Sequence, residues 1–159
     1  MYFLSNLIVA YLVASIFVYG AFANLNGEFL QMEKFQLLAV ISGSAFFSTL
    51  AREIVKDIED VEGDRKRYSV TLPIRHGIPA ARQVANTFLS IAIILSAIPI
   101  LIPGKYFNTV TYAVLIIISN LIFISSLNRH PATAQKMMIA GMTVAILAFF
   151  VGEFTTNLF

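Results

Sequence analysis

Five long apolar stretches set the strongest limit on how this chain of 159 residues can fold. Each is long enough to cross the roughly 30 Å hydrocarbon layer as a helix that rises about 1.5 Å per residue. With 58% apolar residues, the chain has too few polar side chains to cover a soluble core. We therefore expect an all-α integral membrane bundle. The predicted spans are Tyr2–Ala23, Phe35–Ala51, Val84–Ile102, Tyr106–Leu127 and Met137–Phe154.

The charged residues, only 13% of the chain, are concentrated in one segment. Seven of the eleven Lys and Arg and six of the nine acidic residues lie between Arg52 and Arg82. Because bases and acids alternate there, a track for nucleic acid is excluded, and membrane topology and anionic headgroups explain the bases better. The absence of Cys excludes disulfides and thiolate metal sites. We predict a single transmembrane domain over residues 1–159, with a charged segment at about 52–82.

The distribution of bases also predicts an orientation. With five spans, the start of the chain shares a side with the loops after the second and fourth spans. That side carries nine of the eleven Lys and Arg, and the other side carries Lys34 and Lys105. Because bases accumulate on the cytoplasmic side, we expect a multi-pass protein of the plasma membrane. Its N-terminus and charged segment should be cytoplasmic and its C-terminus outside.

The acidic residues of this segment have helical spacing. We expect the helix of the second span to continue into the charged segment, because Arg52 to Asp60 contains no Gly or Pro. If it continues further as one helix, four carboxylates share a stripe about 60° wide. Carboxylates three and four residues apart repel one another, so neighbouring bases or divalent cations should offset their charge. Charge alone also fits a solvated, salt-bridged helix end. The four residues are Glu53, Asp57, Asp60 and Asp64.

Oxygen ligands without Cys and with little His favour Mg²⁺ over zinc. Mg²⁺ held by one or two carboxylates completes its shell with water and substrate phosphate oxygens. Guanidinium and ammonium groups beside such carboxylates bind phosphate oxygens directly. The segment therefore suggests a diphosphate site at the membrane surface.

The stretch from Arg52 to Arg67, followed by Thr71-Leu72-Pro73, resembles the second aspartate-rich motif of the UbiA-type membrane prenyltransferase superfamily. Within it, the stretch is most similar to archaeal digeranylgeranylglyceryl phosphate synthases. Asp60 and Asp64 match the DxxxD of that motif, and Asp57 lies one turn earlier. Members have nine transmembrane helices around a central cavity, and Mg²⁺ between two aspartate-rich motifs binds a prenyl diphosphate.

The resemblance implies transfer of geranylgeranyl from its diphosphate to geranylgeranylglyceryl phosphate, which forms an ether. Membrane lipids, the prenyl diphosphate and the lipid-phosphate acceptor are the implied partners, and metal and bases stabilise the departing diphosphate. It implies Asp57, Asp60 and Asp64 as Mg²⁺ ligands, with Asp60 and Asp64 catalytic. It implies diphosphate contacts from Lys56, Lys66 and Arg67, and Glu53, Arg52, Asn120 and His76 are further candidates.

One departure from the family is large. The first aspartate-rich motif is missing, because residues 1–56 contain no Asp. We therefore expect the likeness to cover the C-terminal five of nine helices, and the chain to be incomplete and inactive alone. Its partner would be the N-terminal helices, in the same or a separate chain.

Several alternatives remain open. A UbiA-type enzyme can use an aromatic acceptor of the quinone or chlorophyll/haem type, and no residue here fixes the acceptor or the prenyl length. CDP-alcohol phosphotransferases share a DxxxD, but their upstream Asp-Gly-x-x-Ala-Arg is absent. A non-enzymatic lipid-binding helical membrane module would need the bases and not the aspartates. His76 and His130 lie on the same predicted side and form a candidate two-His metal site.

Some small and polar residues interrupt the apolar spans. Ser42-Gly43-Ser44 and Gly141 permit close approach of helices. Asn6, Ser119 and Asn120 are expected to serve helix packing, with local hydrogen bonds. Of these, Asn120 is the candidate for lining a cavity.

Overall fold

The computed structural model describes residues 3–23, 32–101 and 109–154. These residues form helices and no strands. The helices are α1 (Leu4–Ala23), α2 (Met32–Glu59), α3 (Val61–Lys66), α4 (Leu72–His76), α5 (Ile78–Leu101), α6 (Thr109–Ser126) and α7 (Pro131–Phe154).

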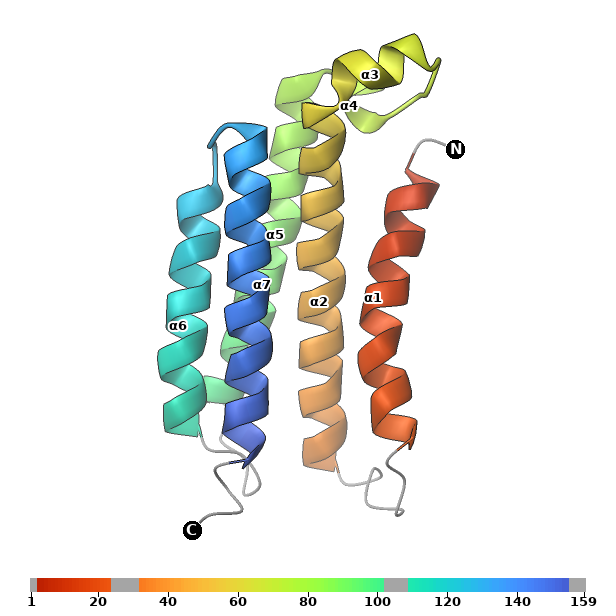
Figure 1. Ribbon diagram of the computed structural model, residues 1–159. Helices are drawn as coiled ribbons and strands as arrows, with labels where there is room; N and C mark the ends of the chain where they lie inside the picture. Colours follow the sequence, from red (N-terminus) through yellow and green to blue (C-terminus); the bar gives the residue numbers. More distant parts are fainter. Residues whose placement is uncertain (1–2, 24–31, 102–108, 155–159) are drawn as a thin grey trace.

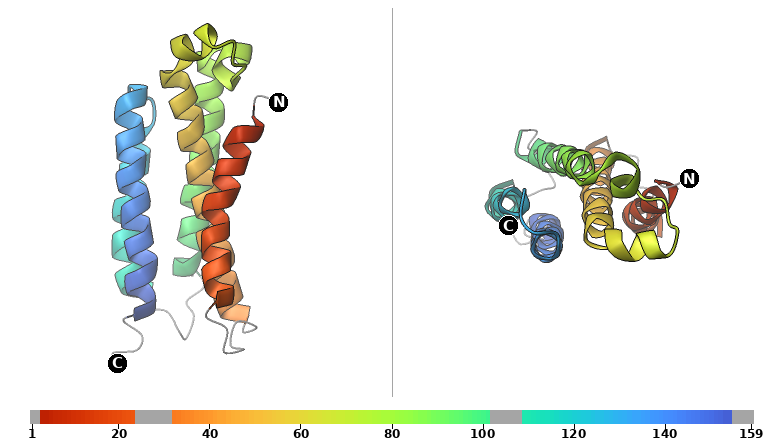
Figure 2. Two further views of the ribbon diagram at one scale, coloured as in Figure 1. Left: turned by 45° about the vertical axis from the view of Figure 1, so that its right-hand side comes forward. Right: turned by 90° about the horizontal axis from the view of Figure 1, so that it is seen from above.

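The five long helices lie side by side, and the short helices α3 and α4 cover one end of the bundle (Figure 1). α2 is central, because it packs against α1, α5 and α7, while α6 packs against α5 and α7. Seen from above, in the right-hand view of Figure 2, α1 lies at one edge of the bundle beside α2. The start of α1 and the turn between α6 and α7 lie at the same end as α3 and α4 (Figure 1). We call this end, formed by residues 52–76, the charged end.

The prediction of a multi-pass helical bundle is confirmed. Four described helices are long and apolar enough to cross a membrane, and Val110–Ser126 is a shorter apolar helix. α2 runs past Ala51 to Glu59, as expected for a segment without Gly or Pro. α7 begins six residues before the predicted Met137, because Pro131 suits the first turn of a helix. The span ends predicted at Tyr2, Ile102 and Tyr106 lie outside the described residues.

Small residues bring α5 close to α2. Ala81, Ala85 and Leu89 recur at helical spacing along α5 and are fully buried. On the α2 side, a Cβ added to Gly43 would lie 3.3 Å from Cδ1 of Leu95. Close approach of backbones gains van der Waals contact, which is the main attraction between helices in lipid.

Gly141 has the same role between α6 and α7. A Cβ at this position would lie 2.7 Å from Cε1 of Phe123, well inside van der Waals contact. The Ser119 hydroxyl donates a buried hydrogen bond of 2.8 Å to the Gly141 carbonyl. The prediction that Gly141 permits close helix approach is confirmed.

We expect Gly141→Ala to lower the free energy of unfolding by about 1–3 kcal/mol, because the added methyl overpacks the contact with Phe123. Thermal unfolding in detergent measures this change. Gly20→Ala is the matched control, since nothing lies within 4 Å of its added Cβ. Ala also favours the helix there. Equal melting temperatures for the two variants would contradict the prediction.

Candidate functional site

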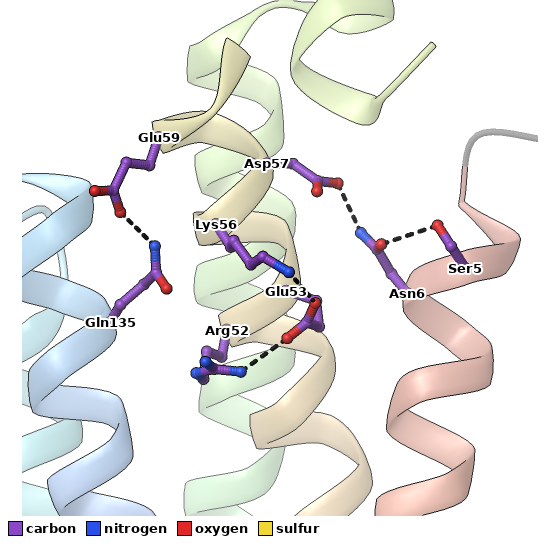
Figure 3. Close-up of polar contacts among 8 residues, drawn as sticks. All are labelled: Ser5, Asn6, Arg52, Glu53, Lys56, Asp57, Glu59 and Gln135. Carbon is purple, nitrogen blue, oxygen red and sulfur yellow. Dashed lines mark hydrogen bonds and ion pairs between the residues drawn. The ribbon is translucent and has the colours of Figure 1, made fainter. Parts of the chain in front are cut away.

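A buried carboxylate organises the last turns of α2. Glu53 is only 7% exposed. Its Oε1 accepts a hydrogen bond of 2.8 Å from Nη1 of Arg52, and its Oε2 lies 3.4 Å from Nζ of Lys56 (Figure 3). A buried charge must be paired, and here the chain's own bases supply the pairing. Glu53 therefore holds two bases in place, and both of its oxygens are already engaged.

Asp57, one turn further along α2, contacts α1. Nδ2 of Asn6 donates a hydrogen bond of 2.8 Å to Oδ2 of Asp57, and the Ser5 hydroxyl donates to Oδ1 of Asn6 at 3.3 Å (Figure 3). Glu53 lies four residues before Asp57 and Asp60 three residues after it, spacings at which like charges repel. One oxygen of Asp57 is thus held by α1, and acids lie on both sides of Asp57 along the chain.

The contact between Asn6 and Asp57 was not predicted from sequence. The two residues are 51 positions apart, so no helical spacing links them. The available signal was a single amide in an apolar helix, which needs a partner when it is buried.

The helix changes direction at Asp60, so the condition for a single carboxylate stripe through Asp64, one continuous helix, is not met. Asp60 has φ −89° and ψ 7° and separates α2 from α3. Figure 1 shows α3 turning away from the axis of α2. The bend has a tertiary cause, because the chain must return from Glu59 to Ile78, where α5 packs beside α2.

Backbone hydrogen bonds continue across this bend. The Asp60 amide donates to the Lys56 carbonyl at 3.0 Å, and the Asp64 amide donates to the Asp60 carbonyl at 2.9 Å. The Asp60 side chain is exposed and makes no capping hydrogen bond to α3. Its carboxylate is therefore not engaged in holding the bend.

The end of α3 carries the remaining bases of the motif. Lys66 is the last residue of α3, Arg67 follows it, and both are exposed. Tyr68, with φ 56°, ends the helix, and the Ser69 amide then donates to the Asp64 carbonyl at 3.0 Å. Neither side chain makes a hydrogen bond or an ion pair with another described residue, so both are available to bind an anion.

The Thr-Leu-Pro part of the motif has a structural role. Pro73 lies in the first turn of α4 and is buried, and Leu72 packs against the core. Gly77, with φ 85°, ends α4 in a conformation that favours glycine. α4 therefore packs on α2 and α5 and returns the chain to the bundle. His76, the last residue of α4, is exposed, as is His130 before α7.

Within the described residues, no group of three or more His, Asp or Glu is arranged to hold a metal ion. The described residues therefore do not form a complete cage of protein ligands. The donor chemistry still fits Mg²⁺, which needs only one or two carboxylates when water and phosphate oxygens supply the rest.

Asn120 lies on α6 and contacts α5. Its Nδ2 donates to the Ser96 hydroxyl at 3.0 Å, and the Tyr112 hydroxyl donates to the Ser96 carbonyl at 2.6 Å. These bonds join α5 to α6 in the packing role expected of a polar residue in a span. Asn120 does not line the cavity that lies among the long helices.

A mostly apolar cavity of about 90 Å³ lies among the long helices. Its polar lining from α2 includes Ser44 and Ser48, and the Ser44 hydroxyl has no hydrogen-bond partner among the described residues. Ser48 precedes Asp57 by nine residues, which is about 14 Å along a helix. The cavity thus lies below the charged end. Its apolar lining includes Val13 and Phe17 of α1, Ile41 of α2, Phe123 of α6 and Met142 and Phe149 of α7.

Known proteins resemble the chain over most of its length. The model of the UbiA prenyltransferase family matches residues 1–147. The digeranylgeranylglyceryl phosphate synthase of Haloquadratum walsbyi is 36% identical, over 93% of this chain and 50% of the relative. The synthase of the same name from Methanosphaera stadtmanae is also 36% identical, over 94% of this chain and 54% of the relative.

A solved structure is similar as well. It belongs to a study of digeranylgeranylglyceryl phosphate synthase in membranes, with a TM-score of 0.81 and 31% identity. The match covers 97% of this chain and 54% of that one. The chain therefore spans about half the length of the relatives it matches.

Proposed function

We propose that this chain, which belongs to the UbiA prenyltransferase family, carries the diphosphate-binding aspartates of an intramembrane prenyltransferase of archaeal ether-lipid synthesis. The enzyme would transfer geranylgeranyl from its diphosphate to geranylgeranylglyceryl phosphate. The observation that supports this most is the position of the aspartates. Asp57 lies in the last turn of α2, which lines the apolar cavity, and Asp60 and Asp64 follow directly after it. A diphosphate at the charged end would leave its prenyl chain free to enter the bundle.

The aspartates and bases divide the binding of the diphosphate between them. Asp57, Asp60 and Asp64 would hold Mg²⁺, which when bound supplies charge that stabilises the departing diphosphate. Lys56, Lys66 and Arg67 would bind phosphate oxygens. Lys56 retains donors for this task, because an ammonium has three and Glu53 takes one at 3.4 Å.

In the reaction, the bond between the prenyl C1 and the diphosphate oxygen breaks, and its electron pair leaves with the diphosphate. The acceptor hydroxyl oxygen forms the new ether bond to C1 and releases its proton. Fixed positive charge beside the leaving oxygens lowers the barrier as negative charge develops there.

We also propose that complementary helices complete the site, in the same or a separate chain. The described residues do not assemble three metal ligands. The cavity of about 90 Å³ is smaller than the roughly 300–1,000 Å³ of ordinary ligand sites. α1 also presents a wide apolar face to its surroundings, in which Tyr11, Ile16 and Tyr19 are exposed. Further helices packed beside α1 would enlarge the cavity and supply the first aspartate-rich motif.

The side of the membrane assigned to the charged end carries nine of the eleven Lys and Arg, which supports a cytoplasmic location for it, in a plasma membrane protein. The start of α1 and the turn before α7 would then be cytoplasmic as well, since they lie at the same end (Figure 1). Cysteine labelling at Tyr68, which is exposed on this end, would test the orientation in inverted and right-side-out vesicles.

An acceptor assay tests the proposed reaction. The chain assembled with its complementary helices should convert geranylgeranyl diphosphate and geranylgeranylglyceryl phosphate to an ether-linked product, detected by mass spectrometry. A chelator should stop the reaction, and added Mg²⁺ should restore it. Hydroxybenzoate is the control acceptor for the aromatic alternative. Transfer to hydroxybenzoate alone would show that the proposed acceptor is wrong.

A further inference from the structure

We infer that Asn6 is a positioning residue for Asp57, an inference that rests on the proposed function because it takes Asp57 as a metal ligand. The amide holds Oδ2 of Asp57 and leaves Oδ1 to face an incoming cation. Asn6 lies outside the aspartate-rich segment, on a different helix, and its contact is visible only in the folded protein (Figure 3).

The orientation of the Asn6 amide follows from its two partners. An ionised carboxylate only accepts hydrogen bonds, so Asn6 must present Nδ2 to Asp57, at 2.8 Å. Oδ1 of Asn6 then faces the Ser5 hydroxyl, which donates to it at 3.3 Å. A flipped amide would place two acceptors against each other at Asp57, so the network fixes a single arrangement.

Burial makes this bond persistent. Asn6 is 5% exposed and carries the one side-chain amide of α1. An amide buried without a partner is costly, so α1 cannot shift along α2 without breaking a bond that it needs. The position of α1 and the orientation of the Asp57 carboxylate are therefore coupled.

Repulsion between neighbouring acids favours such a tether. Glu53 and Asp60 lie four and three residues from Asp57, spacings at which like charges repel, and the Lys56 ammonium also pairs with Glu53. Without Asn6, the Asp57 side chain would be free to turn away from the other aspartates. Partners that hydrogen-bond a ligating carboxylate typically improve metal affinity about 10- to 100-fold.

The test uses the complete enzyme, in which the chain is assembled with its complementary helices. Asn6→Leu removes both polar groups and keeps a similar volume. The dissociation constant for Mn²⁺, measured by electron paramagnetic resonance, should rise about 10- to 100-fold, and so should the half-saturating Mg²⁺ concentration for transfer. The kcat should largely recover at saturating Mg²⁺. Asn6→Gln, which retains the amide donor, should restore part of the metal affinity.

Two controls separate positioning from stability. Ser119→Ala removes a buried hydrogen bond between α6 and α7, so it should lower the melting temperature and leave the Mn²⁺ affinity unchanged. In an Asp57→Asn background, Asn6→Leu should have little further effect on Mn²⁺ affinity, because both changes act on one contact. If Asn6→Leu lowers only the melting temperature, the inference is overturned. Failure of the proposed function would appear instead in the unmodified enzyme, as transfer that needs no metal.

Discussion

Replacing Asp60 or Asp64 by Asn is expected to weaken Mg²⁺-dependent binding of geranylgeranyl diphosphate more than about 100-fold. Loss of a residue that only hydrogen-bonds a metal ligand typically costs about 10- to 100-fold, and loss of a ligand itself should cost more. Asn keeps the shape of Asp and removes the charge that attracts the cation. The fold should tolerate both changes. The Asp60 side chain makes no capping bond, and the Asp64 group that receives the Ser69 amide is its backbone carbonyl.

Binding of a labelled diphosphate to the assembled enzyme, with and without chelator, measures this effect. Glu62→Gln is the matched control, because Glu62 is an exposed acid of the same short helix and is not part of the DxxxD. It should bind like the unmodified enzyme. Equal binding by Asp60→Asn, or binding that a chelator does not reduce, would favour the non-enzymatic lipid-binding module, in which bases alone hold the anion.

The second large effect concerns the assembly of the site. Expressed alone, the chain of 159 residues is expected to show no detectable prenyl transfer, because it carries only one of the two aspartate-rich motifs that the proposed metal site needs. Co-expression with helices that carry a first aspartate-rich motif should restore transfer. The part of the Haloquadratum walsbyi synthase that this chain does not match is a suitable source, since that relative is 36% identical and about twice as long as the match.

Product formation in membranes from cells that express one or both parts measures the restoration. The control is the same complementary part with the aspartates of its motif replaced by Ala, which should assemble without restoring transfer. Robust transfer by the chain alone would show that the proposed division of the metal site is wrong.

Much of the fold could be predicted from the apolar spans. α2 continues to Glu59 as expected, since Arg52 to Asp60 contains no Gly or Pro. The bend at Asp60 could not be predicted, because no helix breaker marks it. It arises from tertiary packing, in which α3 and α4 contact each other and α2, and Glu59 accepts a hydrogen bond from Gln135 of α7.

The candidate site, too, could be predicted from the sequence only in part. The residue types and spacing of the motif predicted the aspartates and bases, and their roles as metal and diphosphate ligands stay predictions. The pairing of Glu53 with Arg52 and Lys56 follows from proximity in one helix. The contact of Asn6 with Asp57 depends on how α1 packs against α2, which spacing within one helix cannot reveal.

The buried Glu53 also affects how an anion would reach the protein from water. Glu53 offsets one of the two positive charges of Arg52 and Lys56, and the exposed Arg65, Lys66 and Arg67 stand beside five acids between Asp57 and Asp64. Cations bound by these acids would let the three bases attract an anion from a distance. Such steering raises association rates and weakens as salt is added. The bases near α3 would therefore set the speed of substrate arrival and its dependence on ionic strength. Lys56 and Asp57 of α2, which Glu53 and Asn6 hold in place, would govern how long the substrate stays bound.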